Sequence, residues 1–193
     1  AATASDSTNA TGYTFAGTAI GAASASRLVV VGVKGWSSGS GPDSVTVTIA
    51  GIAATEINRL NVGSHCMALF SASVPTGTTG TIVLTFSSQQ DRCGIVVWAV
   101  TTMTPTVYDA DYSLNDPGAI ILDVPAGGVA IGMGGVNANT TATWTNLTED
   151  ADTTIENSNF TGASAAFAST QNGLAISCDY AITATPATVA ASW

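Results

Sequence analysis

The chain is poor in charge, and above all in positive charge. Only 9% of its 193 residues are Asp, Glu, Lys or Arg, against about a quarter in an average domain. Four residues are cationic, and the formal net charge is −9. Nucleic-acid binding needs a basic surface that releases counterions from phosphate, and anionic lipid surfaces attract basic segments. The composition therefore argues against nucleic-acid and membrane-surface partners.

Long apolar runs, cysteine pairs and helical periodicity are scarce as well. No stretch of about 20 apolar residues is present, so we expect no membrane span. The three cysteines, Cys66, Cys93 and Cys178, are too few and odd in number for a disulfide-rich secreted scaffold. We expect them to be buried thiols of a protein made in a reducing cytoplasm. No window of a dozen residues has apolar side chains at helical spacing.

Strand patterns, by contrast, are dense. Residues 43–49 and 81–86 alternate between apolar and polar side chains, which is typical of strands with one face on a core and one in water. Residues 28–33 and 94–100 are apolar on both faces, which predicts central or covered strands. Turns rich in Gly, Pro and Ser separate the runs. The sequence therefore predicts an all-β fold.

The strand pattern occurs twice along the chain. Three pairs of large apolar residues recur at offsets of 95–97 residues: Val47 and Trp144, Phe70 and Phe167, Trp98 and Trp193. Doubled strand sets with tight turns build two-sheet sandwiches, including jelly rolls. We therefore predict a two-sheet, jelly-roll-like β-sandwich with two pseudo-repeated strand sets.

The length fits one domain, because all-β sandwiches of this size are usually single units. We expect one sandwich domain over residues 12–193, with pseudo-halves at about 12–104 and 105–193. Residues 1–11 are small and polar and hold too few apolar side chains to fold alone. We expect them to form an N-terminal arm that reaches a neighbouring subunit.

No motif in the sequence points to catalysis, a cofactor or a metal. The only histidine, His65, has no GxSxG turn to accompany it, so a hydrolytic triad is not indicated. The four carboxylates between Glu149 and Glu156 lack EF-hand spacing, although Ca²⁺ favours such ligands. We interpret them, with Asp109, Asp111 and Asp116, as acidic edges that discourage strand pairing between molecules. We predict a non-enzymatic protein with no cofactor or metal site.

The tryptophans give the one indication of a ligand surface. Trp98 and Trp193 lie in apolar strands, so both indoles are expected in the core. Trp36 and Trp144 lie beside polar loops and are the candidates for contact with a ligand or partner, for example as sugar-stacking rings. This interpretation favours a glycan-binding module.

Several segments of the sequence resemble a group of uncharacterised structural proteins of tailed bacteriophages. These segments are residues 12–21, 27–33 and 47–55 and the terminal residues 190–193, and the similarity extends from about Gly12 to Trp193. The resemblance implies a virion-surface component assembled in the bacterial host cytoplasm, such as a capsid decoration (cement) protein or head spike. Its partners would be other capsid or tail subunits and further copies of itself. The alternative within this resemblance is a glycan-binding module of a tail fibre or adhesin; no site residue is implied.

Overall fold

The computed structural model describes residues 1–39, 41–181 and 186–193, and over these ranges it contains β-strands and no helix. The strands are β1 (Ala2–Asp6), β2 (Ala10–Ala19), β3 (Leu28–Trp36), β4 (Val45–Ile49), β5 (Ile52–Ala53), β6 (Thr55–Val62), β7 (His65–Ser73), β8 (Thr79–Gln90), β9 (Arg92–Val100), β10 (Asp109–Ser113), β11 (Gly118–Val124), β12 (Val129–Val136), β13 (Ala142–Thr145), β14 (Thr148–Ile155), β15 (Ser158–Ala166), β16 (Gln171–Tyr180) and β17 (Ala187–Ser192).

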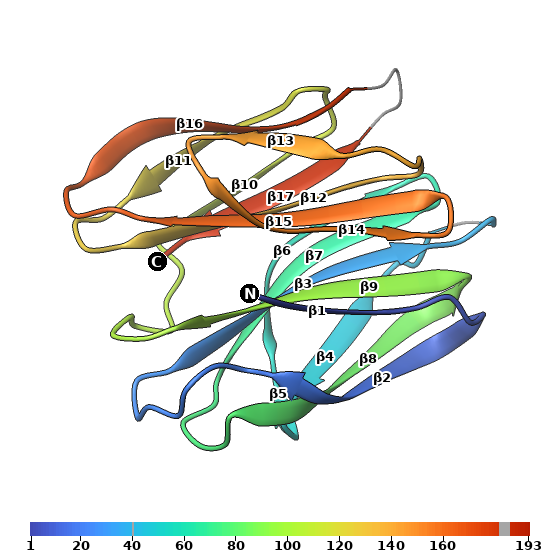
Figure 1. Cartoon of the computed structure of the whole chain (residues 1–193), viewed down its shortest axis with the longest axis horizontal. Coiled ribbons are helices and arrows are strands. Elements are labelled where there is room, and N and C mark those ends of the chain that lie inside the picture. Colours follow the sequence, from blue (N-terminus) through green and yellow to red (C-terminus); the bar gives the residue numbers. More distant parts are fainter. Residues whose placement is uncertain (40, 182–185) are drawn as a thin grey trace.

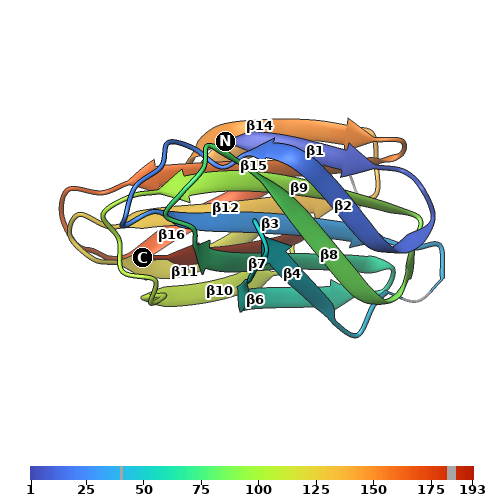
Figure 2. The same ribbon diagram turned by 90° about the horizontal axis from the view of Figure 1, so that it is seen from below.

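These strands form four antiparallel sheets. Outer sheet I has the order β2-β8-β4-β5 and inner sheet I the order β1-β9-β3-β7-β6. Inner sheet II has the order β10-β17-β12-β15-β14 and outer sheet II the order β11-β16-β13. Figure 1 shows them stacked from outer sheet I at the bottom to outer sheet II at the top, with the inner sheets facing each other. Figure 2 shows how β2, β4 and β8 cross the inner sheet I strands obliquely.

Apolar side chains fill all three spaces between the sheets. Strand β3 is buried on both faces: Val29, Val31 and Val33 belong to the core with outer sheet I, whereas Leu28 and Val30 belong to the core between the inner sheets. A third core lies between inner and outer sheet II. This arrangement confirms that the fully apolar runs are central strands, since each contributes to two cores at once.

The two halves have the same strand order. Inner sheet I (β1-β9-β3-β7-β6) matches inner sheet II strand for strand, and β2-β8-β4 matches β11-β16-β13. Even the bulges correspond, because β6 shifts register between Glu56 and Asn58 while β14 shifts between Glu149 and Ala151. The all-β sandwich with repeated strand sets is confirmed, with four sheets instead of two because each half forms its own sandwich. The jelly-roll connectivity stays a prediction.

The N-terminal residues differ from the expected arm. Residues Ala2–Asp6 form β1 and pair with β9 along their whole length, and β2 begins at Ala10. Ala2 and Ala4 pack against the first core, while Thr3 and Ser5 are exposed. The prediction of a free arm is wrong for these residues, because backbone pairing and two small half-buried side chains suffice to hold a strand against an existing sheet.

The pair Trp98 and Trp193 lies in the core between the inner sheets, as predicted. Their exposed fractions are 5% and 3%, and both belong to the same apolar cluster. Trp98 is the cross-strand partner of Val30. Trp193 exchanges two backbone hydrogen bonds of 2.9 Å with Val129. The end of the chain is therefore fixed to the central core by both its backbone and its ring.

Candidate functional site

Trp36 is the last residue of β3 and lines a groove. Strands β3 and β12 end on the same side of the molecule (Figure 1). We call this hollow of about 340 Å³ the Trp36 groove. Its lining comes from the ends of β3 and β12 and from the β6–β7 hairpin: Trp36, Val62, Gly63, Ser64, His65, Val136 and Asn137. Both halves of the molecule therefore contribute to one groove.

Arg92 covers one face of the Trp36 ring. Its Cζ lies 4.0 Å from the ring centroid, a distance at which a cation is attracted to the π-system. The guanidinium Nη1 also donates to Glu156 Oε2 at 2.5 Å. The Arg92 side chain is 7% exposed and that of Glu156 is 55% exposed. The Nε of Arg92 is buried and has no hydrogen-bond partner.

Lys34 lies directly behind the wall of the groove and is 3% exposed. Its Nζ is 3.3 Å from the carbonyl oxygen of Val136, 3.4 Å from Ser158 Oγ and 3.5 Å from His65 Nδ1. All three are neutral acceptors, because burial, together with Lys34 and Arg92 nearby, lowers the pKa of His65 to about 3. Burial and the charge of Arg92 lower the pKa of Lys34 to about 7. The ammonium group is thus held without a carboxylate partner.

The positions of the cations make this end of the molecule electrostatically distinct. Three of the four cationic residues, Arg27, Lys34 and Arg92, are buried. Arg27 is used elsewhere, since its guanidinium donates to four backbone carbonyls at 2.6–2.8 Å. Arg59 pairs with Glu56 on the surface. Lys34 and Arg92 therefore lie next to residues of the Trp36 groove, Arg92 against the Trp36 ring and Lys34 against Val136 and His65, in a protein whose other charges are mostly negative.

Trp144, the second predicted contact residue, lies elsewhere. It is on β13 of outer sheet II and is half-buried against the cores of the second half. Its Nε1 donates to Thr161 Oγ1 at 3.0 Å, and its ring is positioned over Gly132, where a Cβ would meet it at 2.7 Å. Trp36 and Trp144 do not share a surface, because one ends a strand of inner sheet I and the other packs onto inner sheet II.

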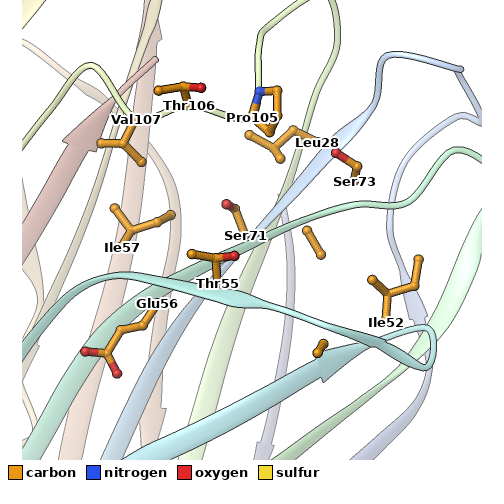
Figure 3. A pocket seen from close by; sticks show the side chains of 12 residues that line it. Leu28, Ile52, Thr55, Glu56, Ile57, Ser71, Ser73, Pro105, Thr106 and Val107 are labelled. Carbon is orange, nitrogen blue, oxygen red and sulfur yellow. The ribbon is translucent and has the colours of Figure 1, made fainter.

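A larger groove lies beside the segment that connects the halves. It measures about 500 Å³ and is shown in Figure 3. Leu28, Ile57, Pro105 and Val107 surround it, whereas the carboxylate of Glu56 is directed away from the other labelled side chains. A pseudo-equivalent hollow of about 490 Å³ is lined by residues of both halves, among them Trp98, Val129 and Asp150. The lining of the first combines apolar side chains with hydroxyl groups and one carboxylate, that of Glu56.

Five of the thirteen acidic residues lie on the outer strands of inner sheet II. Glu149, Asp150 and Asp152 are on β14, and Asp109 and Asp111 are on β10. The Asp109 and Asp111 carboxylates accept hydrogen bonds from the N–H groups of the residues that follow them, at 2.8 Å each. These donors are occupied, which fits an edge that discourages pairing with another chain. Over residues 1–39, 41–181 and 186–193, no group of three or more His, Cys, Asp or Glu side chains is placed to hold a metal.

Large apolar side chains are exposed on β10, on β11 and on residues beside these strands. They are Tyr108 (58% exposed), Tyr112 (52%), Leu114 (37%) and Ile121 (55%). We call these four residues the β10–β11 patch. Another exposed residue of this kind, Ile52 (41%), is on β5 in the other half. Large apolar side chains that are exposed on neighbouring strands are candidates for contact with a partner.

The sequence did not single out the patch or the buried cations. The available signal for the cations was a charged residue at an end of an otherwise apolar strand, Lys34 in β3 and Arg92 in β9. Such residues are almost never fully buried without a partner. The three cysteines are free and buried, as expected.

Comparisons with protein-family models, with curated proteins and with solved structures found no match to this chain. Within the part of the chain that the structure describes, no helix is long and apolar enough to cross a membrane.

Proposed function

We propose that this protein is a non-enzymatic structural protein of a tailed-phage virion, a capsid decoration (cement) or head-spike protein that binds other virion subunits at the particle surface. The observation that carries the proposal is the β10–β11 patch, whose two tyrosines and two aliphatic side chains are 37–58% exposed. Tyrosine is enriched at protein interfaces, where it provides apolar area and a polar tip. Neighbouring carboxylates of Asp109 and Asp111 favour a partner with basic residues.

The rigid stack of four sheets supports the same function. Each inner sheet is held from both sides by apolar cores, so the patch is carried on a scaffold that loses little entropy when it binds. The buried cations leave an acidic exterior, which resists non-specific pairing between copies.

The test is to locate the protein on particles of the phage that encodes it. We expect mass spectrometry of purified particles to detect it and antibody labelling to place it on their surface. The double variant Tyr112→Ser/Ile121→Ser should reduce its incorporation at least tenfold. Ile52→Ser is the matched control, because it also removes an exposed apolar side chain and should leave incorporation unchanged. Particles that lack the protein would contradict the function; equal loss in the double variant and the control would contradict the role of the patch.

A second function, the glycan-binding module of a tail fibre or adhesin, is supported by the Trp36 groove. The groove combines a half-buried tryptophan with the hydroxyl of Ser64, the amide of Asn137 and the imidazole of His65. Grooves with one aromatic surface and a few convergent polar groups are typical small-ligand sites. Trp144 gives weaker support, because its Nε1 and ring are engaged within the second half.

A further inference from the structure

We propose that the Trp36 groove binds a saccharide that carries a carboxylate, such as a uronic acid, and that the ammonium group of Lys34 behind the groove wall selects it over the neutral sugar. The inference rests on the glycan-binding function and names the class of ligand. It does not depend on where in a virion the protein lies.

The groove has the size and the surface that a single sugar ring requires. Its volume of about 340 Å³ lies within the usual range of small-molecule sites, roughly 300–1,000 Å³. Trp36 supplies a flat apolar surface. Ser64, His65 and Asn137 line the same hollow and can exchange hydrogen bonds with sugar hydroxyls.

Lys34 is connected to the groove wall through each of its contacts. His65 and the carbonyl of Val136, both in the wall, lie 3.5 and 3.3 Å from Nζ. The third contact, Ser158, donates in turn to Oδ1 of Asn137 at 3.0 Å, and Asn137 is also in the wall. The ammonium group is therefore one residue behind the surface that a ligand would touch. At this depth its field reaches the groove with little screening by water.

The ammonium group of Lys34 has no carboxylate partner among the described residues. Glu156 is the carboxylate that pairs with Arg92, while the described contacts of Lys34 are all neutral. A buried charge without a partner is costly, so a ligand carboxylate in the groove would supply the missing negative charge. A neutral sugar would not.

The groups that face Lys34 determine how its protonation changes when a carboxylate binds. Burial and Arg92 on β9 disfavour its charge, whereas Cys93 on β9 would favour it only as a thiolate, and His65 on β7 is neutral. Glu156, in the turn between β14 and β15, pairs with Arg92, and the nearest groups from β12 and β15 are the neutral Val136 and Ser158. Because the pKa of Lys34 is about 7, a bound carboxylate should draw a proton onto it near pH 7.5.

The experiment is isothermal titration calorimetry of the full chain with D-glucuronate, D-glucose and sodium acetate at pH 7.5 and low salt. We expect glucuronate to bind at least tenfold more tightly than glucose or acetate. Repeating the glucuronate titration in two buffers of different ionisation enthalpy should reveal proton uptake on binding. Trp36→Ala should abolish binding of glucuronate and glucose, with Trp36→Phe retaining part of it.

Two variants that each remove a cationic side chain test whether Lys34 is responsible for the preference for glucuronate. Lys34→Met should weaken glucuronate binding about tenfold and abolish the proton uptake. Arg59→Met, which removes a cation from the surface pair with Glu56, should change neither. Equal affinity for glucuronate and glucose, or an unchanged preference in Lys34→Met, would overturn the inference while leaving the glycan-binding function intact. Acetate binding as tightly as glucuronate would overturn the sugar assignment, and no binding of either sugar would overturn both proposals.

Discussion

Replacing Lys34 by methionine should stabilise this protein, although the substitution removes three polar contacts. The Lys34 ammonium is buried without a carboxylate partner, and its pKa falls to about 7 from an ordinary value of 10.5. The unfolded chain therefore binds more protons than the folded chain between pH 7 and pH 10.5. By linkage, the free energy of unfolding rises with pH through this window.

The size of the stabilisation by Lys34→Met follows from the shift in the pKa of Lys34. Keeping Lys34 in the folded state at pH 7 costs about 4 kcal/mol, and this cost falls by about 1.5 kcal/mol between pH 7 and pH 8.5. Methionine retains the unbranched stem, which packs so closely that a Cβ at Gly135 would lie 2.8 Å from Lys34 Cδ. Lys34→Met should therefore unfold at a higher temperature at pH 7, by roughly ten degrees.

The assay is urea unfolding of the parent and the variant at pH 7.0, 7.5, 8.0 and 8.5, read by tryptophan fluorescence. We expect Lys34→Met to raise the free energy of unfolding most at pH 7, and this increase to become smaller as the pH rises. Arg59→Gln is the control, because it breaks an exposed pair with Glu56 and should change stability by less than about 1 kcal/mol at every pH. A less stable Lys34→Met at pH 7, or a gain that is the same at pH 7 and 8.5, would refute the reasoning.

Three further predictions concern other buried groups. Trp193→Ala should lower stability by about 3–5 kcal/mol, because the ring is 3% exposed in the central core; an unchanged melting temperature would show that this core does not depend on it. Arg27→Met should cost at least about 3 kcal/mol in urea unfolding, since it leaves four carbonyl acceptors without their donor, and Arg27→Lys should recover only part. Burial raises the pKa of the Cys66 thiol to about 12 and raises those of Cys93 and Cys178 as well. The unfolded chain loses thiol protons first, so stability should fall as the pH rises above about 9, and a triple Cys→Ala variant that shows the same alkaline loss would contradict this.

The all-β class and the repeated halves could be predicted because they depend on local alternation. Residues 45–49 and 81–86 show a period of two, and a strand is the structure that sorts such side chains onto opposite faces. The fully apolar run at 28–33 predicted a strand covered on both sides, and β3 is such a strand. Strands with weak apolar patterns were missed: β1 and β14 are rich in small or acidic residues, and their backbone pairing to β9 and β15 holds them in place.

Only part of the candidate site could be predicted from the sequence. Trp36 could be singled out because an aromatic residue precedes a polar loop, but nothing local indicates that Lys34, Arg92 and Val136 meet there. Those residues are 44–102 positions apart along the chain. Lys34 and Arg92 come together because β3 and β9 pair within inner sheet I, and Val136 joins them because inner sheet II packs face to face on inner sheet I. Alternation fixes which face of a strand is apolar, and each inner sheet has two such faces. Which sheet covers each face, and so which charges are buried together, depends on contacts between distant strands that no local pattern encodes.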